Sequence, residues 1–243
     1  MAPTLCLIGG CNGAGKTTLA KELLPRLGLM RFLNADEIAR GLSPLDPSLC
    51  AFKAGRLVIE EARAMVTAGA SFALESTLSG KTYVAMLREA KARGFRVVLH
   101  YVMIGSAQQA VERVRLRVSL GGHDVPQEDI VRRYGRSLRH LLDDYLPLAD
   151  EWGVWENWSP PPQEIATDRS HSIPELRELL TSLKVMEPKP SIPTNTSAIV
   201  LEAGRVATEK MLDYYKRMGV RVTPQMTLAP EPKRRAKKAA TAD

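Results

Sequence analysis

The sequence has few cysteines, no long apolar run and no basic leader, and each absence excludes a class of protein. Three cysteines occur, at positions 6, 11 and 50, and neither their number nor their spacing suits a disulfide framework or a zinc site. No apolar stretch approaches the ~20 residues that a membrane-spanning helix needs. The first apolar run is interrupted by Gly9 and Gly10 and follows no basic residue, so we expect a strand there and not a signal peptide. The sequence therefore predicts a cytoplasmic protein without membrane contact.

A basic surface for nucleic acid is also lacking from most of the chain. The 243 residues carry a formal net charge of +7, but residues 1–183 hold 22 Lys and Arg against 21 Asp and Glu, whereas residues 184–243 hold 12 against 6. The excess of positive charge therefore belongs to the C-terminal part. The run Lys-Arg-Arg-Ala-Lys-Lys at 233–238 could bind nucleic acid or other polyanions weakly, but a disordered, solubilising basic tail over 224–243 is the simpler interpretation.

What the sequence does contain is a regular alternation of strand and helix patterns. Over residues 1–183 it predicts an α/β domain of three layers, with a mostly parallel central sheet between helices. Strands are expected at 4–8, 31–34, 71–74 and 96–104, with a last strand or hairpin over 152–158 and 164–166. Helices are expected at 15–27, 48–68, 81–93, 106–121, 126–148 and 172–183. Prolines then indicate a linker over 184–197, and helical spacing predicts a helical extension over 198–223.

The segment from Gly10 to Thr17 matches the phosphate-loop pattern G-x-x-x-x-G-K-[ST] in full, between an expected strand and an expected helix. Its glycines allow successive N–H groups to point at phosphate oxygens, and the helix adds the positive end of its dipole. Lys16 would reach the β- and γ-phosphates of ATP, and the Thr17 hydroxyl would hold Mg²⁺. The expected nucleotide contacts are Gly10, Cys11, Asn12, Gly13, Ala14, Gly15, Lys16, Thr17 and Thr18. Kinases, GTPases and transport ATPases share this loop, so it does not choose the reaction.

Two acidic residues follow expected strands and could choose it. Asp36 stands just after the second strand, which lies next to the first in many P-loop folds, and Glu75 ends the third strand. The carboxyl ends of parallel strands line the crevice where ligands bind. Asp36 could accept the proton of a substrate hydroxyl, and Glu75 could orient magnesium-bound water or bind that hydroxyl, with Thr77 as a further polar contact. The alternatives are an N-cap role for Asp36, in a helix that starts at residue 37, and a capped helix start after Glu75.

Arginines gather along two expected helices that a Gly-Gly pair at 121–122 separates. They are Arg113, Arg115, Arg117, Arg132, Arg133 and Arg136. Two helices with such a hinge would form a lid over about 106–148, and its closure would bring guanidinium groups onto the transferring phosphate and exclude water. Arg113 and Arg117 share one helix face, whereas Arg115 points elsewhere. The alternative is a solvated helix face on which the charges are paired.

Four motifs in this order resemble the zeta-toxin-like family of P-loop kinases, in particular the branch described as predicted ABC-type ATPases. They are Gly9–Thr17 (GGCNGAGKT), Asn34–Ala39 (NADEIA), Glu75–Gly80 (ESTLSG), and Gly121–Pro126 (GGHDVP) followed by Arg132-Arg133-Tyr134. The resemblance covers roughly residues 3–183. The sequence departs from the family pattern at Cys11, where this branch usually has proline, and after Glu75, where the plasmid toxins have a basic, glycine-containing stretch.

The resemblance implies a P-loop NTPase fold with a helical lid and a small-molecule kinase activity. Zeta toxins transfer the γ-phosphate of ATP to the 3′-hydroxyl of the sugar in UDP-N-acetylglucosamine, until an antitoxin protein occludes the ATP site. The resemblance implies UDP-N-acetylglucosamine or a related sugar nucleotide as acceptor, and it leaves a possible antitoxin partner. The alternative is an ATP-binding or ATP-hydrolysing module with a regulatory or partner-binding role.

The resemblance also implies a role for individual residues. Asp36 corresponds to the catalytic base and Glu75 to a carboxylate on the substrate and magnesium side. Lys16 and Thr17 match the ATP and Mg²⁺ ligands. The two lid arginines correspond best to Arg117 and Arg133, with Arg113, Arg132 and Arg136 as close alternatives, and Asn157 stands where the family has a polar residue near the nucleotide.

Overall fold

The computed structural model describes residues 2–119, 122, 124–158 and 161–185. All of them belong to the first of two compact units, Met1–Lys189, and the second unit, Pro190–Asp243, lies outside the described residues. The expected linker, helical extension and basic tail therefore also lie outside the described residues, except for Lys184 and Val185.

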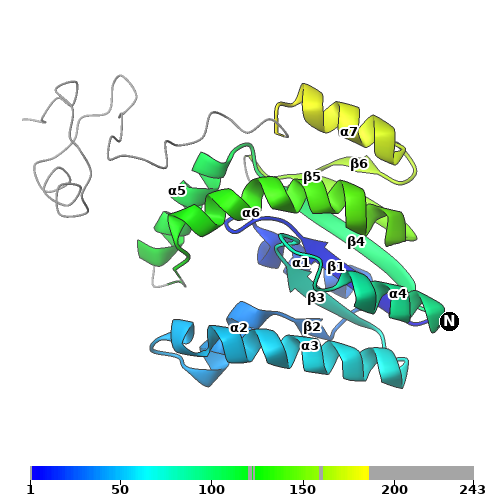
Figure 1. Ribbon diagram of the computed structural model, residues 1–243, viewed down its shortest axis with the longest axis horizontal. Helices are drawn as coiled ribbons and strands as arrows, with labels where there is room; N and C mark the ends of the chain where they lie inside the picture. The colour runs from blue at the N-terminus through cyan, green and yellow to red at the C-terminus, as the bar shows by residue number, and fades with distance from the viewer. Residues whose placement is uncertain (1, 120–121, 123, 159–160, 186–243) are drawn as a thin grey trace, which may run out of the picture. The chain divides into compact units, whose positions relative to one another are not determined.

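A six-stranded sheet in the order β2-β3-β1-β4-β5-β6 forms the centre of the domain (Figure 1). The strands are β1 (Thr4–Gly9), β2 (Phe32–Leu33), β3 (Phe72–Ser76), β4 (Arg96–Met103), β5 (Glu151–Glu156) and β6 (Gln163–Thr167). Strands β1 to β5 are parallel, and β6 pairs antiparallel with β5. The two central strands, β1 and β4, are mostly buried, because helices cover both faces of a parallel sheet. The predicted, mostly parallel sheet is confirmed.

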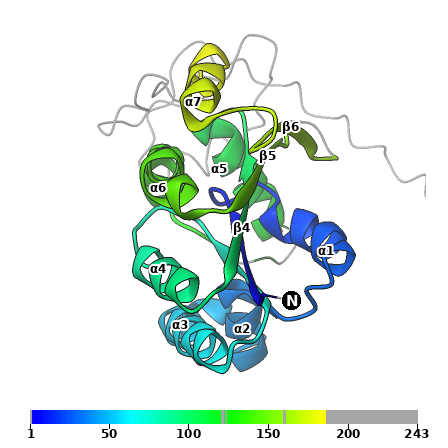
Figure 2. The ribbon, with the colours of Figure 1, turned by 90° about the vertical axis from the view of Figure 1, so that its right-hand side faces the viewer.

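Helices lie on both faces of this sheet, as the view along its edge shows (Figure 2). They are α1 (Lys16–Arg26), α2 (Ala35–Leu42), α3 (Ala51–Ala68), α4 (Val84–Ala92), α5 (Ala107–Ser119), α6 (Gln127–His140) and α7 (Ile173–Ser182). Along β1 the side chains alternate between the faces. Leu5 and Leu7 belong to the core with α3 and α4, whereas Cys6 and Ile8 pack with residues of α1. No helix in the described ranges is long and apolar enough to cross a membrane.

The expectation that the second strand lies beside the first is wrong, because β3 lies between them. Strand β3 pairs with β1 over five residues and buries Phe72, Ala73 and Leu74, whereas β2 has two residues and pairs with β3. The longer apolar strand therefore takes the central position and the short one lies at the edge. The ends of β1 and β3 become neighbours, which places Glu75 directly beside the phosphate loop.

The expectation of one continuous helix over 126–148 is also wrong. Helix α6 ends at His140 and is followed by a π-helical turn, Leu141–Tyr145, and a 3₁₀ turn, Leu146–Leu148. Pro147 has no N–H group and cannot continue an α-helical ladder. The helix expected from residue 48 likewise begins with a 3₁₀ turn, Pro47–Cys50, before α3.

Candidate functional site

The loop between β1 and α1 requires glycine at three positions. Gly10, Gly13 and Gly15 have φ angles of 144°, 77° and 96°, which side chains of L residues rarely adopt. A Cβ atom on Gly10 would lie 2.3 Å from the Val102 carbonyl oxygen, and one on Gly15 would lie 2.4 Å from Asn157 Nδ2. The loop therefore keeps its curled shape through both backbone freedom and close approach to β4 and to the residue after β5.

A cavity of about 230 Å³ opens over this loop. Its lining residues come from the loop, α1, α2, the end of β3 and α5, and they are Asn12, Gly13, Gly15, Lys16, Thr17, Thr18, Asp36, Glu75, Arg113 and Arg117. The fold thus brings both candidate carboxylates and two candidate lid arginines, Arg113 and Arg117, to the phosphate loop from distant parts of the sequence. Thr77 and Arg133 do not line this cavity as the described residues define it.

Glu75 is held by three side chains. Its Oε1 lies 3.4 Å from Lys16 Nζ, and its Oε2 accepts hydrogen bonds from the Thr17 hydroxyl at 2.7 Å and from Asn34 Nδ2 at 2.9 Å. Lys16 Nζ also donates to the Cys11 carbonyl oxygen at 3.1 Å. The side chains of Lys16 and Glu75 are 8% and 12% exposed, so this ion pair is largely shielded from water. The cation and the hydroxyl that are expected to meet ATP and Mg²⁺ thus both contact one partly buried carboxylate.

Asp36 lies in the first turn of α2, and the alternative that it caps a helix is wrong. The cap is Asn34, whose Oδ1 accepts hydrogen bonds from the backbone N–H groups of Asp36 and Glu37 at 2.8 Å and 3.3 Å. The Asp36 side chain is 45% exposed and its Oδ2 lies 3.9 Å from Arg117 Nη1. Asp36 therefore faces the cavity with its carboxylate accessible, as a residue that meets a substrate must.

The segment after Glu75 is a loop and does not start a helix. Helix α4 begins only at Val84, and its N-terminal residue Tyr83 makes no side-chain cap. Leu78 has a φ angle of 51° and is fully buried, and a Cβ on Gly9 would lie 2.5 Å from its Cδ1. The Thr77 hydroxyl is 2.9 Å from the Ser79 hydroxyl. The buried, strained leucine therefore fixes this loop and the polar side chains on either side of it.

The candidate lid arginines differ in what they contact. Arg113 donates to the carbonyl oxygens of Asn157 and Trp158 at 2.6 Å and 3.1 Å, which ties α5 to the segment after β5. Arg133 Nη1 donates to Asn12 Oδ1 of the phosphate loop at 3.3 Å. Arg117 lines the cavity together with Arg113, whereas Arg115, Arg132 and Arg136 are not among its lining residues.

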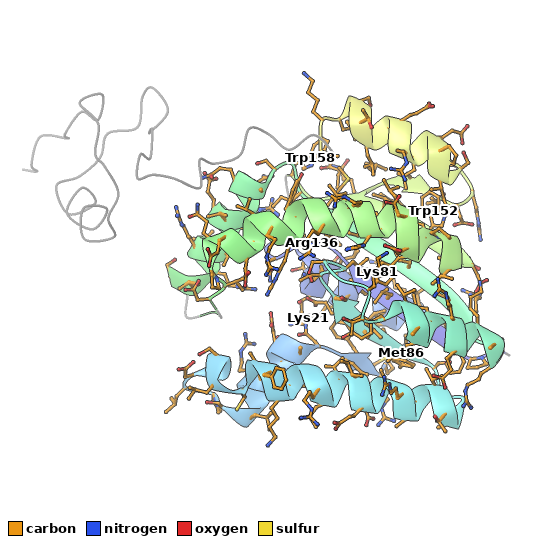
Figure 3. All side chains as sticks on the ribbon, in the orientation of Figure 1. Lys21, Lys81, Met86, Arg136, Trp152 and Trp158 are labelled. Atoms are coloured by element: carbon orange, nitrogen blue, oxygen red, sulfur yellow. The ribbon has the colours of Figure 1, made fainter. Side chains whose placement is uncertain are left out.

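Those three arginines have other surroundings. Arg115 donates to Gln127 Oε1, and Arg132 forms an exposed ion pair with Asp129 on its own helix. Arg136 lies on α6, as Figure 3 shows. Gly121 and His123, at the expected hinge, lie outside the described residues.

Helix α6 is attached to the rest of the domain by polar contacts along its length. The Tyr134 hydroxyl donates to the Ile104 carbonyl oxygen at 3.0 Å, and the Ser137 hydroxyl donates to the Thr77 carbonyl oxygen at 2.5 Å. Ile130 and Leu138 are buried. One helix therefore contacts the phosphate loop through Arg133 and the loop after β3 through Ser137.

Asn157 supports the phosphate loop from the end of β5. Its Nδ2 donates to the Ala14 carbonyl oxygen at 2.8 Å, and its backbone N–H donates to the Met103 carbonyl oxygen at 3.0 Å. The side chain is buried, and its Oδ1 has no hydrogen-bond partner among the described residues. An unsatisfied buried acceptor is costly in a folded protein, so the role of Asn157 that the structure supports is the hydrogen bond of its Nδ2 to the phosphate loop.

Cys11 lies inside the phosphate loop with its thiol packed among apolar residues. Burial raises the pKa of this thiol to about 11, although the nearby Lys16 lowers it in part. The thiol therefore stays protonated near neutral pH and is a poor nucleophile. Cys11 helps to position Lys16 through its carbonyl oxygen, which accepts a hydrogen bond from Lys16 Nζ.

Asn34 is the site residue that the sequence did not single out. It stands in the NADEIA motif, directly before an expected helical turn, at a position that favours asparagine as a cap. That signal could have identified the cap, but not the hydrogen bond to Glu75, which depends on β3 lying next to β2.

Comparisons with known proteins show the family and the fold of the chain. A family model described as an AAA domain (AAA_33) matches residues 5–136. An uncharacterized protein of Haemophilus influenzae is 32% identical over 125 residues, which cover 51% of this chain and 88% of that protein. The structure of AvrRxo1-ORF1:-ORF2 with ATP is similar with a TM-score of 0.60 at 17% identity, over 91% of this chain and 72% of that chain.

A structure from the PezAT chromosomal toxin-antitoxin system of Streptococcus pneumoniae is similar with a TM-score of 0.52 at 16% identity, over 88% of this chain and 85% of that chain. At such identities the likeness shows the fold. The resemblance to zeta-toxin-like P-loop kinases, first seen in four sequence motifs, is therefore confirmed at the level of architecture.

Proposed function

Because the chain belongs to the AAA domain family, whose P-loop kinase-like fold it shares, we propose that it is an ATP-dependent phosphotransferase acting on a hydroxyl group of a small molecule. One observation carries the proposal. Two carboxylates of different character, the partly buried Glu75 and the more exposed Asp36, line the same cavity as Lys16 and Thr17. A loop that only bound ATP would not need an accessible carboxylate beside the phosphate positions.

In this reaction Asp36 acts as the general base. The acceptor oxygen attacks the γ-phosphorus, its proton passes to the Asp36 carboxylate, and the bond from the γ-phosphorus to the β–γ bridging oxygen breaks, which releases ADP. Lys16 compensates the negative charge on the β- and γ-phosphates. Arg117, whose guanidinium lies 3.9 Å from Asp36, is placed on the acceptor side, and Arg133, bound to Asn12, on the loop side.

The oxygen donors near the phosphate loop fit a magnesium ion. Mg²⁺ prefers oxygen ligands and is commonly held by one or two protein groups together with substrate phosphates. The Thr17 hydroxyl and the Glu75 carboxylate, 2.7 Å apart, are such a pair, so Thr17 would ligate the ion and Glu75 would orient its water. The bound ion would neutralise charge that develops on the phosphate oxygens. Among the described residues no three His, Cys, Asp or Glu side chains form a closed metal site, which an ion shared with ATP does not require.

We propose UDP-N-acetylglucosamine or a related sugar nucleotide as the first acceptor to test. The sequence resemblance to zeta toxins supports this choice, while the departure of the Ser76–Gly80 segment from the toxin pattern makes other sugar or alcohol acceptors worth including. An antitoxin protein is a further part of the proposal, since PezAT is a toxin-antitoxin system. The cytoplasm, where ATP and sugar nucleotides are available, is the proposed compartment.

The test is ATP consumption by the purified protein with Mg²⁺, with and without UDP-N-acetylglucosamine, followed by mass spectrometry of the acceptor. We expect one added phosphate on the acceptor. Lys16→Ala is expected to lose both turnover and calorimetric ATP binding, by 100-fold or more, because a phosphate-binding cation in a shielded site is removed. Equal ATP affinity in wild type and Lys16→Ala would contradict the assigned role of the loop.

The pattern of turnover distinguishes the candidate functions. ATP consumption without a modified sugar nucleotide would retain a phosphotransferase and direct the search to other hydroxyl acceptors. ATP binding without turnover on any acceptor would favour a regulatory ATP-binding module. In that outcome the accessible Asp36 would have no catalytic role.

A further inference from the structure

The Asn34 side chain joins two parts of the candidate site. It is 5% exposed and lies between the end of β2 and the start of α2. Its Nδ2 donates to Glu75 Oε2 at 2.9 Å and lies 3.4 Å from the Thr17 hydroxyl oxygen. Its Oδ1 accepts from the backbone N–H groups of Asp36 and Glu37. The Asn34 amide thus donates to the Glu75 carboxylate through its nitrogen. Through its oxygen it holds the N-terminus of α2, the helix that carries Asp36.

This double attachment matters because each carboxylate has few other fixed contacts. Among the residues that the structure describes, Glu75 Oε2 otherwise accepts a hydrogen bond only from the Thr17 hydroxyl, and in the proposed function that hydroxyl turns to Mg²⁺. Asn34 is then the neutral donor that keeps Glu75 oriented. Asp36 sits in a helix of eight residues that follows a strand of two residues, so its position depends strongly on how the N-terminus of α2 is held.

We propose that Asn34 is a positioning residue that sets the separation and orientation of Glu75 and Asp36 during phosphotransfer. This inference rests on the proposed function. The chemistry of the side chain supports it, because an uncharged amide offers two donors and an acceptor on one rigid plane. Serine or aspartate would cap α2 as well as asparagine does, but an aspartate carboxylate cannot donate to Glu75 and a serine side chain is too short to span both contacts. A residue that only capped the helix would therefore be replaceable by serine, whereas aspartate would also bring a second carboxylate next to Glu75.

The test compares thermal stability with turnover in Asn34→Asp, Asn34→Ser and Asn34→Ala. We expect Asn34→Ser to keep a Tm close to that of wild type, because the cap remains, and Asn34→Ala to melt lower. Asn34→Asp should also melt lower, although its cap remains, because its carboxylate would lie beside that of Glu75. In all three we expect kcat to fall on the order of 10- to 100-fold, as for loss of a hydrogen bond to a charged group, while KM for ATP changes less than threefold in Asn34→Ser. Turnover would therefore not follow stability.

Ser172→Ala is the matched control. Ser172 forms the capping box of α7 with Glu175, away from the cavity. Its replacement is expected to lower Tm by about as much as Asn34→Ala does and to leave kcat unchanged. Loss of a helix cap alone would then be shown not to affect turnover.

Two results would overturn the inference. One is wild-type kcat in both Asn34→Asp and Asn34→Ser. The other is a crystal structure of Asn34→Ser in which the carboxylates of Glu75 and Asp36 keep their wild-type positions. The crystal structure decides the question even if wild type shows no turnover, and that lack of turnover would count against the proposed function alone.

Discussion

The two acidic residues of the cavity, Glu75 at the end of β3 and Asp36 at the start of α2, have the same charge and very different surroundings. Glu75 is 12% exposed and contacts a cation, a hydroxyl and an amide. Asp36 is 45% exposed, and within the described part of the chain its carboxylate has one ion-pair partner, Arg117, at 3.9 Å. A carboxylate with three fixed partners is part of the structure of the nucleotide site. A carboxylate in contact with solvent can exchange that solvent for a substrate.

The difference follows from the position of each residue in the fold. Glu75 belongs to β3, which pairs with β1 over five residues, and β1 leads into the phosphate loop. The hydrogen bonds between these two strands therefore fix the backbone of Glu75 beside that loop. Asp36 belongs to a short helix beyond the edge strand β2. Burial and the number of partners thus distinguish the two carboxylates, in the way that the proposed roles of nucleotide-site support for Glu75 and proton transfer for Asp36 require.

The largest effect is expected for Asp36→Asn. Removal of the proton acceptor should lower kcat by about 10² to 10⁴, with nucleotide affinity and Tm unchanged, because an exposed carboxylate contributes little to stability. Steady-state kinetics with mass spectrometry of the acceptor, together with calorimetry, measure these quantities. Glu37→Gln is the matched control, since Glu37 is the next residue of α2 and pairs with Arg40 at the surface. Full turnover by Asp36→Asn would remove Asp36 from the mechanism.

Glu75→Gln should affect both turnover and stability. We expect kcat to fall by about 10², at the low end of the range for such residues, because the carboxylate beside the Thr17 hydroxyl is lost. We also expect the free energy of unfolding to fall by about 1–3 kcal/mol, because Lys16 remains shielded from water without its counter-charge. Chemical denaturation measures the second effect. Equal stability in Glu75→Gln and Asp36→Asn would break the comparison between the two carboxylates.

The smallest effect is expected for Arg133→Ala. Loss of a guanidinium that contacts Asn12 should lower kcat by about tenfold, which corresponds to ~1.4 kcal/mol in the activation free energy. Arg132→Ala, on the adjacent position of α6, removes an exposed ion pair with Asp129 and should leave kcat within twofold of wild type. Equal losses in the two variants would show that α6 acts through its general charge. In that case Arg133 would have no specific role beside Asp36 and Glu75.

The sequence was sufficient for features that depend on local pattern and insufficient for those that depend on neighbours in space. The phosphate loop was predictable because glycines, lysine and threonine at fixed spacing carry its shape and chemistry. The strand order was not predictable, because the sequence does not show which strand pairs with β1. In the structure β3 pairs with β1 and β2 pairs with β3. Asn34 was missed for the same reason, since its partner Glu75 is 41 residues away and reaches it only across the β2–β3 pairing.

The lid prediction shows a similar limit. Arginine spacing correctly separated Arg115 from Arg113 and Arg117, because spacing on a helix is a local property. The polar contacts of α6 through Tyr134 and Ser137 depend on β4 and on the loop after β3, which the helix pattern does not contain. Whether α5 and α6 close as a lid therefore remains a prediction from the Gly-Gly pair.

The hydrogen bond from Asn157 to the Ala14 carbonyl oxygen has a consequence for protein engineering. The shape of the phosphate loop is specified at two places 143 residues apart, since Asn157 also occupies the space that any side chain at position 15 would need. A graft of residues 10–17 into another α/β scaffold would carry the glycines and Lys16 without the amide that supports them. A transplant of this binding loop should therefore include the residue that follows the fifth strand and should keep glycine at position 15, whose φ angle of 96° other residues rarely adopt.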